Sequence, residues 1–425
     1  MLEKIIDLHI HSKYSRACSG QLELPKIATA CVQKGVDICA TGDYTHPGWF
    51  AHIKEALEEV EKSGLYKLKN ATGKEANIRF ILSTEVSCIY KHKDKTRRLH
   101  HVILAPNISA VEKLIQELEK RHINIHSDGR PIMGLKSKEL LQILLDIDLR
   151  FFLIPAHAWT PWFAIFGSKS GYDSIEECFE ELAPHIRAIE TGLSSDPTMN
   201  HRLSALDNIT LVSNSDAHSL DKIGREANVF GFEKETDISY DEIIKIIKTG
   251  DRKRFLYTIE FYPEEGKYHA DGHLSCEVCL LPNETKKLHK ICPRCKKELT
   301  IGVLSRIDDL ADRTEKEIKP EKFIPHKYIV PLREVIASIF EVGPSSKKVA
   351  REYDNLIKNL GSEFFILLKA DINKIEQVAN DKNIALAITN MRAGKVQVSP
   401  GYDGKFGLVK VIFDKKFKPA QSRLI

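Results

Sequence analysis

The chain has 425 residues, which is long enough for two or three domains and a large core. Its 42% hydrophobic and 29% charged residues are typical of a globular protein, and the absence of an apolar run of membrane-spanning length excludes a membrane-spanning class. The net charge of +4 conceals a division, since residues 276–425 carry 28 Lys and Arg against 19 Asp and Glu, whereas residues 1–275 carry 35 against 40.

A C-terminal part with a net charge of +9 indicates an anionic partner, nucleic acid first, although a solvated charged surface explains the same excess. Five of the nine cysteines are scattered, which favours a reducing compartment over a disulfide framework. The start MLEKIID has no signal-peptide pattern. We therefore expect a cytoplasmic, nucleoid-associated monomer that does not contact membranes.

The first 220 residues alternate short apolar runs with amphipathic stretches. Strands are predicted at 4–10, 36–42, 79–86, 100–105, 151–157, 186–191 and 209–214, and helices at 24–35, 52–64, 109–121 and 137–148. This alternation predicts an α/β barrel or a doubly wound sheet. Strands 79–86 and 100–105 are expected to be antiparallel, because only the charged stretch 91–98 separates them and leaves no room for a crossover helix.

The first predicted strand ends on His9 and His11. Residues i and i+2 of a strand project to the same face, so the two imidazoles can share one metal ion. Alone, this pair also fits two ordinary polar residues at a strand end.

The other predicted strands carry the same kind of residue at the same end. The C-terminal ends carry Asp43 with His46, Glu85, His157, Glu190, and Asp216 with His218; His101 lies at the start of the antiparallel strand, which falls on the same side. Loops at the C-terminal rim of a barrel converge on one spot. We therefore predict a multinuclear site of two or three divalent ions: zinc, manganese, iron or magnesium rather than calcium. Paired ions of this kind hydrolyse phosphoesters.

Two C-x-x-C pairs follow a linker at residues 261–275. Cys276, Cys279, Cys292 and Cys295 have the spacing of a structural zinc site with four thiolates, and His269 and His273 are expected to be bystanders. The surrounding lysines and arginines form either a phosphate-binding face or a solubilising surface. We expect three domains: a catalytic barrel at 1–260, a zinc module at 261–300 and a mainly helical basic region at 301–425 ending in a hairpin at 395–413.

Residues 331–357 predict two helices joined by a Val-Gly-Pro turn. Helix N-termini attract phosphate, so we expect DNA-backbone contacts here, with a plain packing turn as the alternative. The residues proposed for these contacts are Gly343, Ser345 (as the N-cap), Lys347 and Lys348. The last residues, Gln421–Ile425, begin like a sliding-clamp-binding peptide, which makes the clamp a second candidate partner.

Aromatic residues follow the metal-bearing strands. Trp49, Trp159 and Trp162 are candidates for stacking on bases, with a core role as the alternative. The loop Gly167, Ser168, Lys169, Ser170, Gly171 and Tyr172 is rich in backbone donors, with an ordinary surface loop as the alternative. Lys169 and Arg225 are further candidates for phosphate contacts.

The order H-x-H, G-D, E, H, H, D-x-H resembles the polymerase and histidinol phosphatase (PHP) family over residues 1–230. The resemblance implies a distorted (β/α)7 barrel with a trinuclear centre. It assigns His9, His11, Glu85 and Asp216 to one ion, Glu85, His101 and His157 to a second, and Asp43 with His218 to a third. Tyr44 stands where the family has a histidine, so His46 is kept as a reserve ligand.

The segments GDYTHPGWF, PAHAWTPWFAIFGSKSGYDSIEECF, ETGLSSDP, NSDAHS and VGPSSKKVAREYDNLI resemble the endonuclease Q family. This resemblance implies a DNA-repair nuclease that nicks on the 5′ side of uracil, hypoxanthine and xanthine and at abasic sites, with Glu85, Asp216 and His218 as catalytic residues. Backbone N–H groups of the 167–172 loop would read a flipped base. The alternatives are a small-molecule phosphatase and an inert DNA-binding scaffold.

Overall fold

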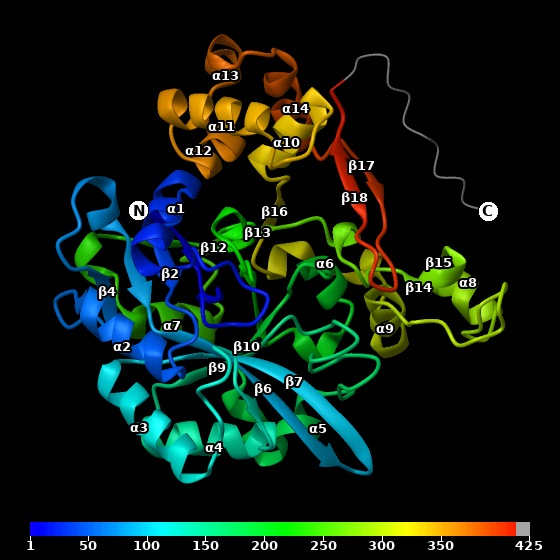
Figure 1. Cartoon of the computed structure of the whole chain (residues 1–425). Helices are drawn as coiled ribbons and strands as arrows, with labels where there is room; N and C mark the ends of the chain where they lie inside the picture. Colours follow the sequence, from blue (N-terminus) through cyan, green and yellow to red (C-terminus); the bar gives the residue numbers. More distant parts are fainter. Residues whose placement is uncertain (414–425) are drawn as a thin grey trace.

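The computed structural model describes residues 1–413, so the clamp-binding prediction at Gln421–Ile425 lies outside the described residues. Figure 1 shows a central arrangement of strands surrounded by helices, a helical cluster above it and a small module beside it. The predicted α/β class is confirmed.

All seven predicted strands are present around the barrel. They are β1 (Leu2–Asp7), β2 (Ile38–Ala40), β5 (Arg79–Ile81) continued by β6 (Ser83–His92), β7 (Lys95–Leu104), β9 (Phe152–Pro155), β10 (Ala188–Glu190) and β11 (Thr210–Val212). β1, β2 and β5 pair in parallel, β6, β7 and β9 pair antiparallel, and β10 pairs in parallel with β11. An isolated β-bridge between Ile10 and Ala217 joins the segment after β11 to the segment after β1.

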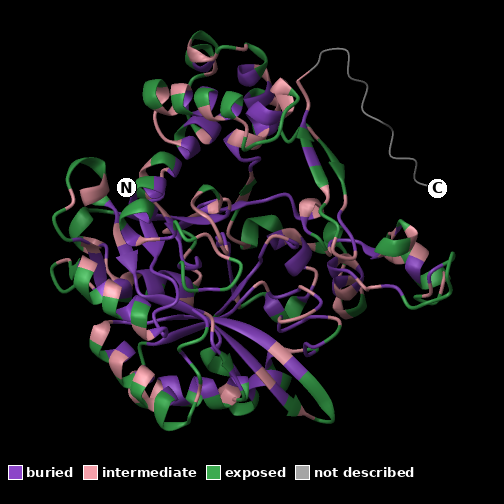
Figure 2. Cartoon of the chain, viewed as in Figure 1, coloured by how far each residue is buried: buried purple, intermediate pink, exposed green. Residues whose placement is uncertain are grey.

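The hairpin β6–β7 confirms the predicted antiparallel pair. Its register runs from Ser83 opposite Leu104 to His92 opposite Lys95. The hairpin leaves the barrel and its tip is exposed (Figure 2), whereas its base is buried beside the other strand ends.

Further strands extend the sheet on either side of β1 and β2. They are β3 (Leu57–Glu59), β4 (Leu65–Leu68), β12 (Ala227–Phe232), β13 (Phe255–Glu260) and β16 (His326–Tyr328). The short β8 (Ile132–Met133) instead pairs with β6 in the sheet of the β6–β7 hairpin. The predicted helix 52–64 is wrong beyond Ala56, because Leu57 is buried in a strand paired with β4.

Helices cover the strands, and capping residues in the sequence mark where two of them begin or end. α1 (Leu24–Lys34) has Pro25 in its first turn and Gly35 in the left-handed conformation at its end, and α3 (Ile108–Lys120) is capped by the Asn107 side chain. The remaining helices of the barrel are α2 (Pro47–Ala56), α4 (Ser137–Ile147), α5 (Ile175–Phe179), α6 (Pro197–Asn200) and α7 (Tyr240–Thr249).

The cysteine-rich module consists of β14 (Asp271–His273), β15 (Val278–Leu280) and α8 (Pro282–Lys287), and α9 (Val303–Leu310) follows it. Its buried core has only three residues, Val278, Cys292 and Leu299. The module projects from the barrel in Figure 1.

The helical cluster packs onto α1. It contains α10 (Leu332–Phe340), α11 (Lys347–Leu360), α12 (Glu363–Leu368), α13 (Ile372–Val378) and α14 (Asn383–Arg392), followed by the hairpin β17 (Val396–Ser399) and β18 (Leu408–Val411). Lys34 of α1 and Glu363 of α12 form a buried ion pair at 2.8 Å. Glu363 also accepts hydrogen bonds from the Tyr353 hydroxyl and the Leu332 backbone, so both of its carboxylate oxygens have partners.

Within residues 1–413, no helix has both the length and the apolar character needed to cross a membrane.

Candidate metal centre

Two histidines at the end of β1 have one ring nitrogen fixed and the other free. His9 Nδ1 lies 3.0 Å from Glu190 Oε1, and His11 Nδ1 lies 3.1 Å from Asp43 Oδ1. All four side chains are buried. A carboxylate behind the Nδ1 of a histidine is the usual arrangement around a metal-ligating imidazole, because it fixes the ring and leaves Nε2 for the ion.

The free nitrogens meet two carboxylates from distant strands. His11 Nε2 lies 3.3 Å from Glu85 Oε2 and 3.2 Å from Asp216 Oδ1, and His9 Nε2 lies 3.6 Å from Asp216 Oδ1. His9 Nε2, His11 Nε2 and Asp216 Oδ1 are buried and have no hydrogen-bond partner among the described residues. Unpartnered imidazole and carboxylate atoms within 4.8 Å of one another fit a divalent cation.

Glu85 also belongs to a second group of ligand atoms. Its Oε1 lies 2.8 Å from His100 Nδ1 and 3.2 Å from His157 Nε2. The shared carboxylate makes the two groups adjacent, which fits a pair of ions bridged by Glu85.

The prediction of His101 as a ligand is wrong, and His100 takes its place. His101 Nε2 lies 2.7 Å from Ser137 Oγ and its ring contacts Phe179 edge-on, within the packing between β7 and the helices. Successive strand residues point to opposite faces, so only one of the two adjacent histidines can face Glu85. Burial lowers the pKa of His101 to about 3, and burial likewise lowers that of His100 to about 4 despite the opposing effect of Glu85.

Strained turns hold the rim residues in place. Asp43, His157 and Asp216 have φ of 48°, 30° and 46°, in or near the left-handed region that non-glycine residues rarely adopt. Gly42 precedes Asp43 with φ of 65°, and a Cβ there would lie 2.5 Å from the Ile10 carbonyl oxygen. The glycine therefore lets the loop after β2 approach the His9–His11 segment.

The residues predicted for a third metal site, Asp43 and His218, do not form a group of metal-ligand atoms. Asp43 bonds to His11 Nδ1 and accepts from the Ser12 backbone and the Ser12 and Ser15 hydroxyls, so it supports His11 from behind. The His218 ring lies 4.6 Å from the His11 ring, with Nδ1 2.9 Å from the Asp216 carbonyl oxygen. His46, the reserve ligand, caps α2 and bonds to the His126 carbonyl oxygen.

Arg130 and the contact of Glu190 with His9 were not predicted from the sequence. Arg130 Nη1 donates to Glu85 Oε2 at 2.9 Å, and its side chain is 25% exposed at the mouth of the site. A Cβ on Gly129 would lie 2.4 Å from Asp43 Oδ2, so this loop is packed directly against the residues behind His11. Burial opposes ionisation of Glu85, but His100 and Arg130 outweigh it and hold the pKa of Glu85 well below its usual range.

Two of the three candidate stacking tryptophans are core residues. Trp49 is fully buried and donates Nε1–H to the Thr41 and Gly42 carbonyl oxygens, and Trp159 is 1% exposed and donates to Asn200 Oδ1. Both predictions of base stacking are therefore wrong. Trp162 is half-buried and packs edge-on against Tyr268, so it retains an exposed part.

The 167–172 loop uses its donors internally, which contradicts its predicted role as a base reader. The backbone N–H groups of Gly167, Lys169, Gly171 and Tyr172 donate to carbonyl oxygens of Ala164, Pro161, Gly167 and Ile165. Ser170 is buried, its hydroxyl donating to the Arg98 carbonyl oxygen. Ser168, half-buried, donates its hydroxyl to the Ile301 carbonyl oxygen, and Lys169 remains exposed.

Arg225 was predicted to contact phosphate, but it braces the site loop instead. Its Nε donates to the Ser215 carbonyl oxygen at 2.8 Å and its Nη2 to that of Asp216 at 3.4 Å. This side chain therefore positions Asp216.

The turn between α10 and α11 is exposed, as its predicted role requires. Gly343, Ser345, Lys347 and Lys348 are all exposed. The N-cap is Ser346, whose hydroxyl accepts from the Val349 backbone N–H, and not Ser345 as predicted.

The cysteine module gathers three of the four predicted thiolates. Cys276, Cys292 and Cys295 group with His273 rather than with Cys279. Cys279 pairs with Gly272 across the β14–β15 hairpin, on the face where a Cβ of Gly272 would meet Tyr402. The Cys279 thiol is therefore outside the group of ligand atoms that lie within 4.8 Å of one another, and the His273 imidazole is in it, whereas four thiolates were predicted.

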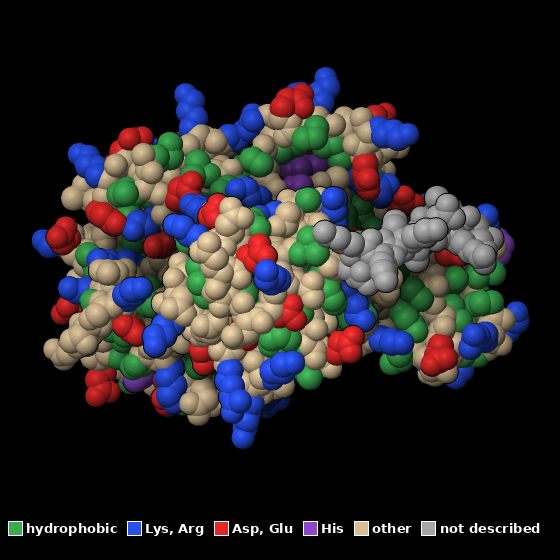
Figure 3. All heavy atoms as spheres, turned by 90° about the horizontal axis from the view of Figure 1, so that it is seen from above, with side chains coloured by type: hydrophobic (Ala, Val, Ile, Leu, Met, Phe, Trp, Pro, Cys, Tyr) green, Lys and Arg blue, Asp and Glu red, His purple; other side chains and the backbone are tan. Residues whose placement is uncertain are grey.

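Figure 3 shows histidine side chains at the bottom of a hollow in one face of the molecule, with Lys and Arg side chains nearby on the rim. A hollow with histidines below and cations on its rim suits an anionic substrate.

The similarity to known proteins extends over nearly the whole chain. Residues 331–395, which hold α10–α14, match the family described as the MJ0043 C-terminal domain. The uncharacterized protein MJ0043 of Methanocaldococcus jannaschii is 30% identical over 268 residues, 62% of this chain, which spans about a third (32%) of that relative. The uncharacterized protein YqxK of Bacillus subtilis is 28% identical over 95% of this chain and 98% of its own.

Two solved structures match at full length. The lesion-specific endonuclease PfuEndoQ from Pyrococcus furiosus is 30% identical, with a TM-score of 0.83 and 96% of each chain covered. An endonuclease Q complex with a 27-mer duplex carrying an abasic lesion at the active site is also 30% identical, with a TM-score of 0.83 and 97% of each chain covered. This chain belongs to the endonuclease Q family.

Proposed function

We propose that this protein is a DNA-repair endonuclease that nicks the backbone on the 5′ side of uracil, hypoxanthine and xanthine and at abasic sites. Its family makes it a metal-dependent nuclease. The observation that carries the proposal is the buried group His9, His11, Glu85 and Asp216, whose free atoms face one point at the mouth of the barrel. DNA is the proposed partner, since the endonuclease Q complex holds a duplex.

The position of each residue in the site decides which metal ion it is proposed to bind. His9, His11 and Asp216 would hold one divalent ion and His100 and His157 a second, with Glu85 between them. When bound, such ions act as Lewis acids on the phosphate and lower the pKa of water. We propose zinc, manganese or magnesium at this centre and one structural zinc in the cysteine module.

Arg130 is the proposed contact to the cleaved phosphate. Its Nη1 is committed to Glu85, while its partly exposed guanidinium offers further donors toward the hollow. A guanidinium presents donors in a planar fork that matches phosphate oxygens. Lys169, exposed beside Trp162, is proposed to contact a flanking phosphate.

His218 is the proposed proton donor to the departing 3′ oxygen. Its side chain is 34% exposed, and its Nδ1 is fixed by the Asp216 carbonyl oxygen, which leaves Nε2 as the reactive nitrogen. Trp162 is proposed to stack on nucleotides beside the lesion, because it is the one tryptophan of the chain that is not buried.

The test compares four substrates in one assay: a duplex with one uracil, a duplex with one abasic site, a plain duplex and a small phosphomonoester, each with Mn²⁺ or Mg²⁺. Nicking confined to the two damaged duplexes supports the proposal. Orthophosphate release from the ester alone indicates a small-molecule phosphatase, and DNA binding without turnover indicates an inert scaffold. Nicking at the abasic site but not at uracil would confine the activity to abasic DNA and contradict the deaminated-base specificity.

A further inference from the structure

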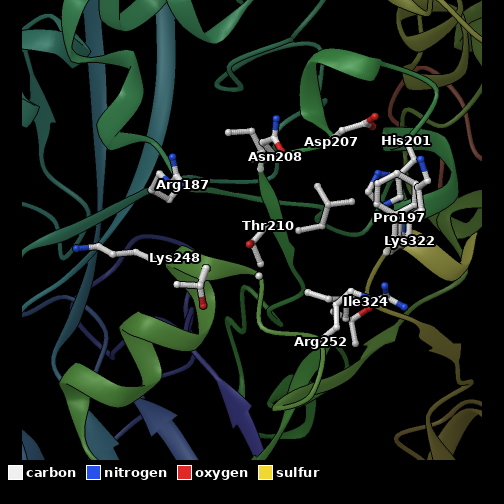
Figure 4. Close-up of a pocket in the computed structure, with 16 residues that line it drawn as sticks. Arg187, Pro197, His201, Asp207, Asn208, Thr210, Lys248, Arg252, Lys322 and Ile324 are labelled. Carbon is white, nitrogen blue, oxygen red and sulfur yellow. The ribbon is translucent and has the colours of Figure 1, made fainter.

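A second cavity lies at the opposite ends of two strands that carry the metal centre. It has a volume of about 340 Å³. Arg187 and Thr210, at the N-terminal ends of β10 and β11, line it, whereas Glu190 and Asp216 lie at or beyond the C-terminal ends of the same strands. Figure 4 shows Arg187, Thr210 and His201 around this space. The two sites are therefore separate.

The cavity is lined by cations that lack partners. Arg187, Arg252 and Lys322 line it, and Lys248 extends outward at its edge (Figure 4). Within residues 1–413 none of these four side chains makes an ion pair or a hydrogen bond. The lining carboxylate, Asp207, is already engaged by Arg313, whose Nη1 donates to it at 3.0 Å. The surplus positive charge favours an anionic ligand.

A stacked pair of rings, His201 and Phe323, forms part of the cavity wall. His201 is 6% exposed and its Nδ1 has no hydrogen-bond partner among the described residues. Its ring stacks on Phe323, with centroids 3.6 Å apart and an interplanar angle of 17°. The stacked Phe323 fixes the orientation of this ring, and together the two rings give the cavity a flat face.

The remaining lining mixes apolar side chains with the polar Asn208, Thr249 and Thr258. Pro197, Ile209 and Ile324 form walls beside Phe323. A cavity of this volume lies at the lower end of the range for small-molecule sites and exceeds what a bare phosphate ion fills. Cations together with apolar walls suit a phosphate group attached to an organic body.

We propose that this cavity binds a small phosphomonoester of nucleotide size. Arg187, Arg252 and Lys322 would hold the phosphate, and the organic part would lie against the wall formed by His201 and Phe323. The ligand is not the phosphate being cut, because the cavity lies at the other end of the strands.

The test is calorimetric titration of the full-length, metal-loaded protein with adenosine monophosphate and with inorganic phosphate. The double variant Arg187→Gln/Arg252→Gln removes two exposed cations, and Lys253→Gln, an exposed neighbour outside the cavity, is the matched control. We expect the double variant to bind the nucleotide at least about tenfold more weakly, since two charge-assisted hydrogen bonds to the phosphate are lost. The control should bind like the wild type.

Three outcomes would overturn the proposal. No binding of the nucleotide to the wild type would do so, and so would equal binding by the double variant, which would place the nucleotide at the metal centre. If the double variant instead loses affinity only for plain duplex DNA, the cations serve the nucleic-acid backbone. Lesion nicking is measured separately, so the failure of this inference leaves the proposed function standing.

Discussion

The two candidate metal groups are built in opposite ways. Ligands of the barrel centre come from strand ends as far apart in the chain as His9 and Asp216, and two large hydrophobic clusters hold those strands. Ligands of the cysteine module come from one short segment whose buried core has three residues. The barrel therefore presents a preformed site, whereas the module depends on its ion for folding.

Both groups nevertheless depart from prediction in the same way. In each, one expected ligand is exchanged for a residue on the other face of a hairpin: His100 replaces His101, and His273 replaces Cys279. Residue type and spacing indicate that a site exists, but strand register decides which neighbouring side chain reaches it.

The largest effect is expected from Glu85→Gln, which tests whether one carboxylate serves both groups of the barrel centre. It removes the charge shared by the two groups and leaves Arg130 without its partner. We expect the nicking rate to fall by about 1,000-fold or more and the bound metal to decrease by at least one ion. Rates come from single-turnover nicking and metal content from elemental analysis.

The matched control is Glu55→Gln, an exposed glutamate on α2. It should nick at the wild-type rate. Full activity of Glu85→Gln with its complete metal content would refute the bridging role.

The next largest effect separates the adjacent histidines. His100→Ala is expected to lower nicking by about 10–100-fold through loss of an ion, in line with the cost of disturbing a metal shell. His101→Ala should keep its metal content and instead lower the free energy of unfolding, because it removes a buried ring packed on Phe179 and bonded to Ser137. Metal analysis and denaturant unfolding on both variants give the answer, and the reverse pattern would restore His101 as the ligand.

A pair of variants in the cysteine module likewise separates the ligand from its neighbour, and we expect a smaller effect on nicking activity there. His273→Asn should lower zinc affinity by about tenfold or more, whereas Cys279→Ser should retain one zinc per module. Zinc release to a competing chelator measures both. Zinc loss from Cys279→Ser with no change in His273→Asn would mean that the original four-thiolate prediction was right.

The strands of the barrel, and the end of the barrel where the candidate metal ligands lie, could be predicted from the sequence. The positions of His9, Glu85 and His157 follow from where apolar runs end, because that pattern is local. The loop around Gly171 and the buried tryptophans could not be predicted. Whether the loop donors are free depends on the exact backbone conformation of residues 161–172, and whether Trp159 is buried depends on tertiary partners such as Asn200.

The smallest effect is expected at the start of α11, where the N-cap lies one position from the predicted residue. Ser346 and not Ser345 caps α11, since its hydroxyl accepts from the Val349 backbone. Ser346→Ala should therefore cost about 1 kcal/mol of unfolding free energy, whereas Ser345→Ala should change it by less than about 0.5 kcal/mol. Both residues border the exposed lysines proposed for DNA contact, so duplex affinity is measured alongside urea unfolding. If Ser345→Ala weakens duplex binding while stability is unchanged, Ser345 contacts DNA without being the cap; if neither variant alters duplex affinity, this turn is a packing element and the DNA contacts lie elsewhere.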